Sequence, residues 1–357
     1  MTAVPSNGQL TADDARSGQR TLDFLEFGCK HLHVGVFSNR RIIPPLVVAT
    51  LVAVAQPHSH PLLALEAQDS EQTLGDQIAE RITLGHTDQA LDEARGAVEQ
   101  FPNSSRLRQL LGVALFRKGL NDEARQTLRR AIELDPSIPE NYYNLALVDL
   151  SERRYDAAAA SLEGSLRCHP PYEAQVRLLL GRAYQNLNRT GPAIDQFRQA
   201  LALDPRLPLA HYHLGFAYHS QGNQGAALEE FEREIKITPA FYDSYWLAGN
   251  ILLDRGDLER AEESFRRGIR LQPESVPAHY GLARVLLARK ELPAAETELL
   301  KALELNPNDV EAHYTLARTY QQMGRSEAAQ REFETVAALH ERQRRALPGI
   351  AARPYPN

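Results

Sequence analysis

The sequence predicts an all-α solenoid made of eight helix-turn-helix units. Prolines recur at a spacing of 34 residues, apart from one spacing of 35, and alanines recur in the same rhythm. The prolines are Pro102, Pro136, Pro170, Pro205, Pro239, Pro273 and Pro307. The alanines are Ala90, Ala124, Ala158, Ala193, Ala227, Ala261, Ala295 and Ala329. A fixed period of this length is the signature of an architecture in which each repeat is one supersecondary unit.

The register of the period divides the chain into eight units. They span residues 71–104, 105–138, 139–172, 174–207, 208–241, 242–275, 276–309 and 310–343. Position 8 of a unit is Gly or Ala in units two to eight, and position 20 is Ala in all eight. Position 24 is bulky in units two to eight, as Leu128, Leu162, Phe197, Phe231, Phe265, Leu299 and Phe333. Small residues at positions 8 and 20 let two helices approach closely, so each unit is predicted to be a helical hairpin.

The borders of the units carry residues that end helices. Proline at position 32 stops the second helix because it cannot continue the hydrogen-bond ladder. Gly119, Gly222, Gly256 and Gly324 fall in the turn between the two helices, where left-handed backbone suits glycine. One unit buries too little surface to fold alone, so stacking must supply the remaining stability and the end units are expected to be atypical. Ile78, which replaces the small residue of position 8 in unit one, agrees with this expectation.

The agreement of many positions in one phase resembles the tetratricopeptide repeat (TPR) family, of bacterial type, over 273 of the 357 residues. The resemblance implies a right-handed superhelical solenoid. It also implies that the first helices line a concave groove, chiefly through positions 2, 5, 9, 12 and 13, and that this groove binds a protein or peptide. Family members that hold the C-terminal carboxylate of chaperones use lysines at fixed positions. Those lysines are missing from this chain, so that role is not expected.

Positions 5 and 9 carry the candidate partner-binding residues. They are Tyr143, Arg182, Tyr212, Trp246, Asn250, Tyr280, Arg284, Tyr314 and Arg318. Aromatic residues and arginine are enriched among binding hot spots, and arginine can bind a carboxylate or a carbonyl. An extended peptide would suit such a line of side chains. A tyrosine at position 5 is also common in the family, so the alternative that these rings pack between units stays open.

Three histidines, His211, His279 and His313, share position 4 of their units. A metal ion would need ligands at about 2 Å from all three. Successive units are too far apart for that, so we expect packed rings and no metal at these positions. Two further histidines, His58 and His60, precede the array and are expected to lie in a linker.

An uncharged apolar run occupies residues 42–55 and follows Arg40 and Arg41. It is shorter than the roughly 20 residues of a membrane-spanning helix and has the length of a signal-peptide core. We therefore expect residues 1–55 to be a leader that is cleaved after Ala55, 56–70 a linker, 71–343 the TPR array and 344–357 a C-terminal tail. Two alternatives stay open, a membrane anchor formed by the uncleaved run and a cytoplasmic protein.

The net charge and the motif content restrict the function. A formal net charge of −6 provides no overall basic field for nucleic acid. The two cysteines, Cys29 and Cys168, form no CxxC pair, and no catalytic motif interrupts the repeats. We expect a non-catalytic scaffold with no cofactor, no metal and no small-molecule substrate, which binds a peptide or disordered partner segment in the periplasm or bacterial cell envelope. The alternatives are an accessory subunit of a separate enzyme and a cytoplasmic scaffold that assembles into homo-oligomers.

Overall fold

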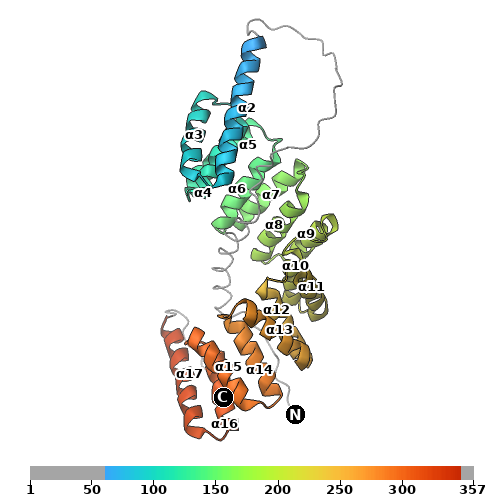
Figure 1. Ribbon diagram of the computed structural model, residues 1–357, viewed down its shortest axis with the longest axis vertical. Coiled ribbons are helices and arrows are strands. Elements are labelled where there is room, and N and C mark those ends of the chain that lie inside the picture. Colours follow the sequence, from blue (N-terminus) through green and yellow to red (C-terminus); the bar gives the residue numbers. More distant parts are fainter. Residues whose placement is uncertain (1–60, 347–357) are drawn as a thin grey trace, which may run out of the picture. The chain divides into compact units, whose positions relative to one another are not determined.

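The computed structural model describes residues 61–346, and its regular secondary structure over that range is entirely helical (Figure 1). The chain forms two compact units divided between Arg189 and Thr190, which we call the N-terminal part (residues 61–189) and the C-terminal part (residues 190–346). The N-terminal part contains α2 (Pro61–Leu84), α3 (Thr87–Gln100), α4 (Ser105–Arg117), α5 (Asn121–Leu134), α6 (Pro139–Ser151), α7 (Tyr155–Arg167) and α8 (Glu173–Asn186). The C-terminal part contains α9 (Thr190–Leu203), α10 (Ala210–Ser220), α11 (Gln224–Ile237), α12 (Tyr242–Asp254), α13 (Leu258–Leu271), α14 (Val276–Ala288), α15 (Leu292–Leu305), α16 (Val310–Gln322) and α17 (Ser326–Ala346). In chain order the helices of the described range match the eight helix-turn-helix units that the period predicts.

In the N-terminal part each helix packs against the next one in the chain, and the first helices α2, α4 and α6 are also neighbours. The core between them contains fully buried Leu107 and Leu128. Ile78 of α2 belongs to the same core and is itself fully buried. The atypical residue of unit one therefore fills space inside the stack.

A buried ion-pair cluster joins α5 of unit two to α6 of unit three. The Nε of Arg125 donates to Asp149 at 3.0 Å, and its two Nη atoms donate to Asp122 and Glu152. The side chains of Arg125 and Asp149 are only 6% and 1% exposed. Burial disfavours the charge of Arg125, but the hydrogen bonds to Asp149 and Asp122 outweigh that effect and raise its pKa. The two helices are thus joined by a buried ion pair, in which each charge compensates for the burial of the other.

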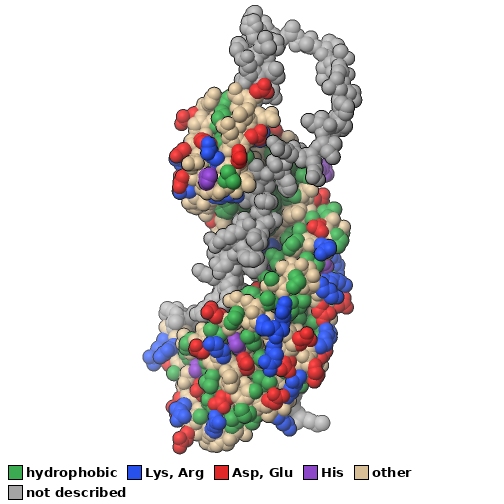
Figure 2. Space-filling view, viewed as in Figure 1, with side chains coloured by type: hydrophobic (Ala, Val, Ile, Leu, Met, Phe, Trp, Pro, Cys, Tyr) green, Lys and Arg blue, Asp and Glu red, His purple; other side chains and the backbone are tan. Residues whose placement is uncertain are grey.

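The C-terminal part repeats the same pattern, with each helix packed against the next and α12 beside α14. Four position-24 side chains are fully buried in it, namely Phe197, Phe231, Phe265 and Leu299. On the face that Figure 2 presents, acidic and basic side chains lie interspersed. Some of them pair between units, as Arg325 does with Glu296 at 2.9 Å. Such exposed pairs each contribute little to stability, so the buried position-24 residues dominate the packing.

The contacts of glycine explain why position 8 is small. A Cβ added to Gly112 would lie 2.6 Å from Leu128, and one added to Gly249 would lie 2.9 Å from Phe265. In each case the clashing side chain is position 24 of the same unit. The small residue of the first helix and the bulky residue of the second are therefore one packing device, as the sequence pattern indicates.

The turn between the two helices of each unit has left-handed backbone at position 15. Glycine occupies this position in five units, as Gly85, Gly119, Gly222, Gly256 and Gly324, with φ between 74° and 80°. The other three units place Arg153, Asn188 and Lys290 there, with φ of 58°, 57° and 64°. In all eight units the next backbone N–H donates to the carbonyl five residues earlier, as in Arg154 to Asp149, which is the hydrogen bond of a Schellman cap. The predicted glycine turn is therefore a feature of every unit, including the three that lack glycine.

The first and the last helix extend beyond the predicted borders of the array. Residues 61–70, which we assigned to the linker 56–70, form the first turns of α2. Helix α17 continues past the unit border at residue 343 to Ala346. The repeat register fixes the positions of residues only within the array, whereas a terminal helix extends as far as its residues favour the helical conformation. Pro61 suits the first position of such a helix. The predicted leader, residues 1–55, lies outside the described residues. Within residues 61–346 no helix combines the length and apolarity that a membrane crossing requires.

Candidate functional site

The five aromatic residues of position 5 lie on first helices. Tyr143 belongs to α6 in the N-terminal part, and Tyr212, Trp246, Tyr280 and Tyr314 belong to α10, α12, α14 and α16 in the C-terminal part. The first four are half-buried, whereas Tyr314 is 47% exposed. Position 5 therefore offers one accessible ring and four that neighbouring residues partly cover.

The covered rings contact residues outside the candidate set. The ring of Tyr143 meets Tyr172 edge-on with centroids 5.3 Å apart, and Tyr212 meets Phe241 in the same way at 4.8 Å. The Nε1 of Trp246 donates to Asp243, one turn earlier on α12, at 2.8 Å. These contacts hold the rings in place. They agree with the alternative that the position-5 rings pack against neighbouring residues along their buried edges.

Tyr280 links two neighbouring first helices. Its hydroxyl lies 3.1 Å from the Oγ1 of Thr315 on α16. Burial, assisted by the charge of Glu311, raises the pKa of the Tyr280 phenol. The hydroxyl therefore stays protonated near neutral pH and remains available for a hydrogen bond.

The polar residues of position 9 form a connected line between α12 and α14. Arg284 donates through Nη1 to the Oδ1 of Asn250 at 3.3 Å and through Nη2 to Asp254 at 3.2 Å. Because its oxygen accepts from Arg284, the Asn250 amide has its NH₂ group left as the donor. Asp254 neutralises part of the arginine charge, so this line is polar but not strongly basic.

The other candidate residues of position 9 are Arg182 on α8, which is half-buried, and Arg318 on α16, which is exposed. Arg318 donates to the hydroxyl of Tyr314 at 3.5 Å, at the limit of a hydrogen bond. The Tyr314 ring contacts Phe333 of α17 with centroids 5.9 Å apart. Tyr314 and Arg318 thus form the most accessible pair among the nine candidates.

The structure brings two pairs of candidates into direct contact, Asn250 with Arg284 and Tyr314 with Arg318. Tyr143 and Arg182 belong to the N-terminal part, and the other seven belong to the C-terminal part. A surface pocket of about 560 Å³ in the N-terminal part contains none of the nine and is lined by residues that include Glu71, Phe101 and Ser104. We therefore concentrate on the first helices α10, α12, α14 and α16, whose position-5 and position-9 side chains we call the docking face.

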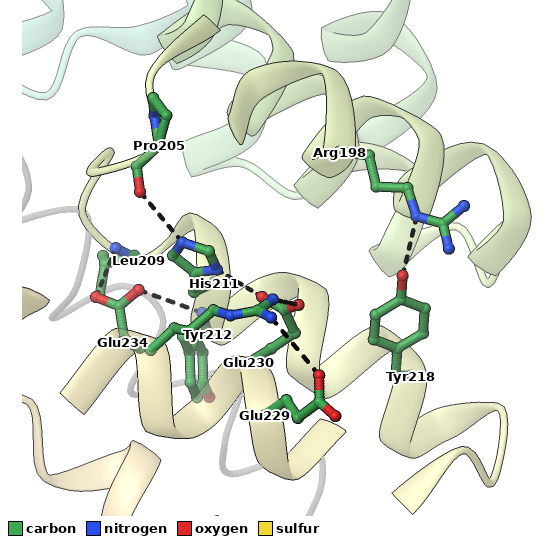
Figure 3. A network of polar contacts seen from close by, with 10 residues as sticks. Arg198, Pro205, Leu209, His211, Tyr212, Tyr218, Glu229, Glu230 and Glu234 are labelled. Atoms are coloured by element: carbon green, nitrogen blue, oxygen red, sulfur yellow. Dashed lines mark hydrogen bonds and ion pairs between the residues drawn. The ribbon is translucent and has the colours of Figure 1, made fainter. Parts of the chain in front are cut away.

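The three histidines of position 4 hold contacts that the sequence analysis missed. Nδ1 of His211 lies 2.5 Å from a carboxylate oxygen of Glu230, and Nε2 lies 3.2 Å from the carbonyl oxygen of Pro205 (Figure 3). His279 has the same two partners in Glu298 and Pro273, and His313 has them in Glu332 and Pro307. His211 and His279 are buried. Within the described residues no group of three or more His, Cys, Asp or Glu side chains is arranged to hold a metal ion.

Glu234 explains another departure from the repeat pattern, because position 27 is usually small. Its carboxylate is fully buried and accepts the backbone N–H groups of Leu209 and Tyr212 at 2.9 Å and 3.3 Å (Figure 3). Leu209, directly before α10, has left-handed backbone with φ of 67°. The glutamate supplies hydrogen-bond acceptors to a helix start whose N–H groups have no partner within the helix.

Comparison with known proteins assigns the family. Models described as tetratricopeptide repeat match residues 80–139, 247–310, 298–331 and 209–241, and a model described as TPR repeat matches residues 181–222. Together these matches cover more than half of the chain. The chain belongs to the tetratricopeptide repeat family, and its fold is that of a protein-interaction scaffold.

Individual relatives cover parts of the chain. BBSome complex member BBS4 of Xenopus tropicalis is 32% identical over 124 residues, which are 35% of this chain and 24% of that protein. A chain of the APC/C hetero-tetramer Cut9–Hcn1 aligns with a TM-score of 0.54 at 18% identity, over 68% of this chain and 48% of that one. PilF of Pseudomonas aeruginosa aligns with a TM-score of 0.53 at 20% identity, over 64% of this chain and 99% of that one. The chain thus spans about a quarter of the curated relative and about half of the first of these structures, and the structural likenesses concern the fold alone.

Proposed function

We propose that this protein is a non-catalytic scaffold whose docking face binds an extended peptide or a disordered segment of a partner protein. The observation that carries the proposal is the accessible pair of Tyr314 and Arg318 on α16, in the same part of the chain as the hydrogen-bonded pair of Asn250 and Arg284. A peptide backbone offers carbonyl oxygens, and a peptide side chain or terminus can offer a carboxylate. Arg318 can bind either group, and the exposed part of the Tyr314 ring can cover apolar atoms.

The hydrogen bonds of the docking face support a peptide as the occupant. The Asn250 amide keeps a donor that a peptide carbonyl can accept, and Arg284 fixes the orientation of that amide. The phenol of Tyr280 is held against α16 by its contact with Thr315 and adds apolar surface to the docking face. Because Asp254 offsets the charge of Arg284, we expect recognition through hydrogen bonds and aromatic contact rather than through a strong electric field.

The cellular location is a separate proposal. We propose that the protein is exported and acts in the periplasm or at the cell envelope, because an apolar run of signal-peptide length at residues 42–55 precedes the array. N-terminal sequencing of the protein purified from its native cells tests this proposal. A mature chain that starts near Gln56 is the expected result, and a chain that retains residues 1–55 argues for a membrane-anchored or cytoplasmic protein.

A random-peptide display library, selected on the immobilised full chain, tests binding at the docking face. Selected peptides are then titrated by fluorescence polarisation against the wild type, Tyr314→Ala and Arg318→Glu. We expect each variant to lose affinity at least severalfold, because each removes a contact to the peptide. Folding should be unaffected, because both side chains are exposed and contribute little to it.

Arg267→Glu is the matched control, because it changes the charge equally on the exposed surface of α13. We expect this variant to bind the selected peptides with unchanged affinity. Equal losses in Arg267→Glu and Arg318→Glu would indicate general electrostatic attraction, and no loss in the Tyr314 and Arg318 variants would place the peptides elsewhere on the chain.

A further inference from the structure

The histidines of units five, seven and eight repeat one arrangement with the same geometry. Each imidazole lies between a glutamate of its own second helix and a proline carbonyl six residues earlier, in the loop that leaves the preceding unit. The distances to the glutamate are 2.5 to 2.6 Å, and those to the carbonyl are 3.0 to 3.2 Å. We call each His–Glu–Pro arrangement a histidine clasp. Each clasp joins three segments, namely both helices of one unit and the end of the unit before it.

The partners of the clasp determine the protonation state that satisfies it. A carbonyl oxygen and an ionised carboxylate are both acceptors, so each ring nitrogen has to donate. Neutral imidazole carries one N–H, whereas imidazolium carries two. The clasp is therefore complete only when the histidine is protonated, and loss of the proton leaves one nitrogen lone pair facing an oxygen lone pair.

Other units of the same chain bind the equivalent carbonyl without histidine. In unit six the hydroxyl of Tyr245 donates to the carbonyl of Pro239 at 3.1 Å, and in unit two the Nε of Arg108 donates to that of Pro102 at 3.2 Å. Unit six also carries Ser264 where units five, seven and eight carry glutamate. Neither tyrosine nor arginine changes its charge near neutral pH. The chain thus contains clasped units and units with a fixed bond side by side.

We propose that the histidine clasps of His211 and His279 make the stacking of units five and seven onto their preceding units responsive to pH, with the protonated clasp as the tight state. Deprotonation removes the hydrogen bond to the preceding unit or the one to the glutamate. Unit six, with tyrosine in place of histidine, keeps its bond throughout the same pH range. Weakening is therefore confined to the borders that carry histidine.

The charged groups around the rings of His211 and His279 favour the protonated state. For His211 these groups come from α11, where Glu230 and Glu234 attract the proton and Arg233 pairs with the second oxygen of Glu230. Burial is the largest single influence and lowers the pKa of His211, but the hydrogen bond and charge of Glu230 outweigh it, so the pKa is raised. The α9–α10 loop faces the ring with the neutral carbonyl of Pro205.

The other two clasps face charged groups on their own second helices. For His279 the hydrogen bond to Glu298 of α15 is the largest influence and raises the pKa, while Lys301 of the same helix opposes it. For His313 the facing charge is Glu332 of α17. The loops before α14 and α16 contribute the neutral carbonyls of Pro273 and Pro307.

The direction of the pH effect follows from linkage. A histidine whose folded-state pKa lies above its unfolded value near 6.5 adds stability that is fully present below that value. The contribution is lost as pH rises through the folded-state pKa. Stacking at the borders of units five and seven is thus expected to weaken from neutral towards alkaline pH.

Hydrogen–deuterium exchange of the full chain at a series of pH values from 6 to 9 tests the proposal. After correction for intrinsic base catalysis, we expect the protection of α10 and α14 to fall severalfold relative to α12, which belongs to the tyrosine unit. A fall of equal size in all three helices, or in none, would overturn the proposal.

A variant with the double change His279→Tyr and Glu298→Ser installs the pair that unit six already uses, and it provides the matched control. We expect α14 in this variant to lose its pH dependence while α10, with its own clasp intact, retains it. If the variant folds poorly, side-chain NMR of labelled histidine in the wild type decides the matter. A pKa of His279 at or below the ordinary value would refute the protonated clasp.

Discussion

The close packing of Phe265 between two first helices leads to a quantitative prediction for Gly281→Ala. A Cβ at Gly281 of α14 would lie 2.1 Å and 2.4 Å from the Cε1 and Cζ atoms of Phe265, which belongs to α13 of the preceding unit. Phe265 is fully buried, and a Cβ at Gly249 of α12 would lie only 2.9 Å from its ring. The ring therefore has no free side towards which it could move.

Two opposing effects set the size of the change. Replacement of glycine by alanine within a helix favours folding by about 1 kcal/mol. Overpacking a filled core costs about 1–3 kcal/mol, and a separation near 2 Å lies well inside contact distance, which argues for the upper end. We therefore expect Gly281→Ala to lower the free energy of unfolding by about 1–2 kcal/mol.

Urea unfolding followed by circular dichroism measures the effect, with Gly268→Ala as the matched control. Gly268 lies in α13, and an added Cβ would meet its nearest neighbour, the Cβ of Ala278, at an ordinary 3.7 Å. Only the favourable effect applies there, so this variant should be more stable by about 0.5–1 kcal/mol. Phe265→Leu should recover part of the loss in Gly281→Ala. A Gly281→Ala protein as stable as the wild type would refute the claim that the Phe265 ring sets the spacing of α12 and α14.

Three further predictions concern residues distributed along the chain. Lys290→Gly should raise the free energy of unfolding by about 0.5–1 kcal/mol, because the relief of a left-handed strain of about 1–2 kcal/mol exceeds the entropic cost of glycine. Thermal unfolding measures this change, and a destabilised variant would contradict the prediction. Asp149→Ala should lower stability by about 1–3 kcal/mol, because the buried Nε of Arg125 loses its acceptor while Asp122 and Glu152 still pair with the Nη atoms. Chemical unfolding measures the change, and an unchanged stability would mean that the Arg125–Asp149 bond contributes nothing to the cluster. Arg318→Glu should weaken binding of selected peptides while changing the free energy of unfolding by less than about 0.5 kcal/mol, since the side chain is exposed. A large loss of stability in that variant would instead assign Arg318 a structural role.

Features that depend on the phase of the repeat could be predicted from the sequence. The pairing of position 8 with position 24 needs only residue volumes, and the glycine turns need only the preference of glycine for positive φ. The sequence does not reveal Arg153, Asn188 and Lys290 as left-handed residues by their own chemistry. Their place in the register would have identified them, because the same turn recurs in every unit and imposes its backbone on whatever residue is present.

Features that depend on pairing between distant positions were missed. The histidine clasp requires the knowledge that position 4 meets position 23 across the hairpin, and a single unit does not show this. The coincidence of His211, His279 and His313 with glutamate 19 residues later was a usable signal. Glu234 is a similar case, since a charged residue at a usually small position indicates a specific partner, here the N-terminus of α10. Burial of the position-5 rings could not be foreseen, because exposure depends on the neighbouring helices.

Site-specific photo-cross-linking tests the proposed docking face most directly. A photoreactive phenylalanine analogue is placed at position 314 or, as the control, at position 267, and the chain is irradiated with a peptide selected on the wild type. The account predicts a cross-linked product from position 314 and none from position 267. A product from position 267 alone, formed by a peptide that still binds with full affinity, would contradict the docking face on the first helices.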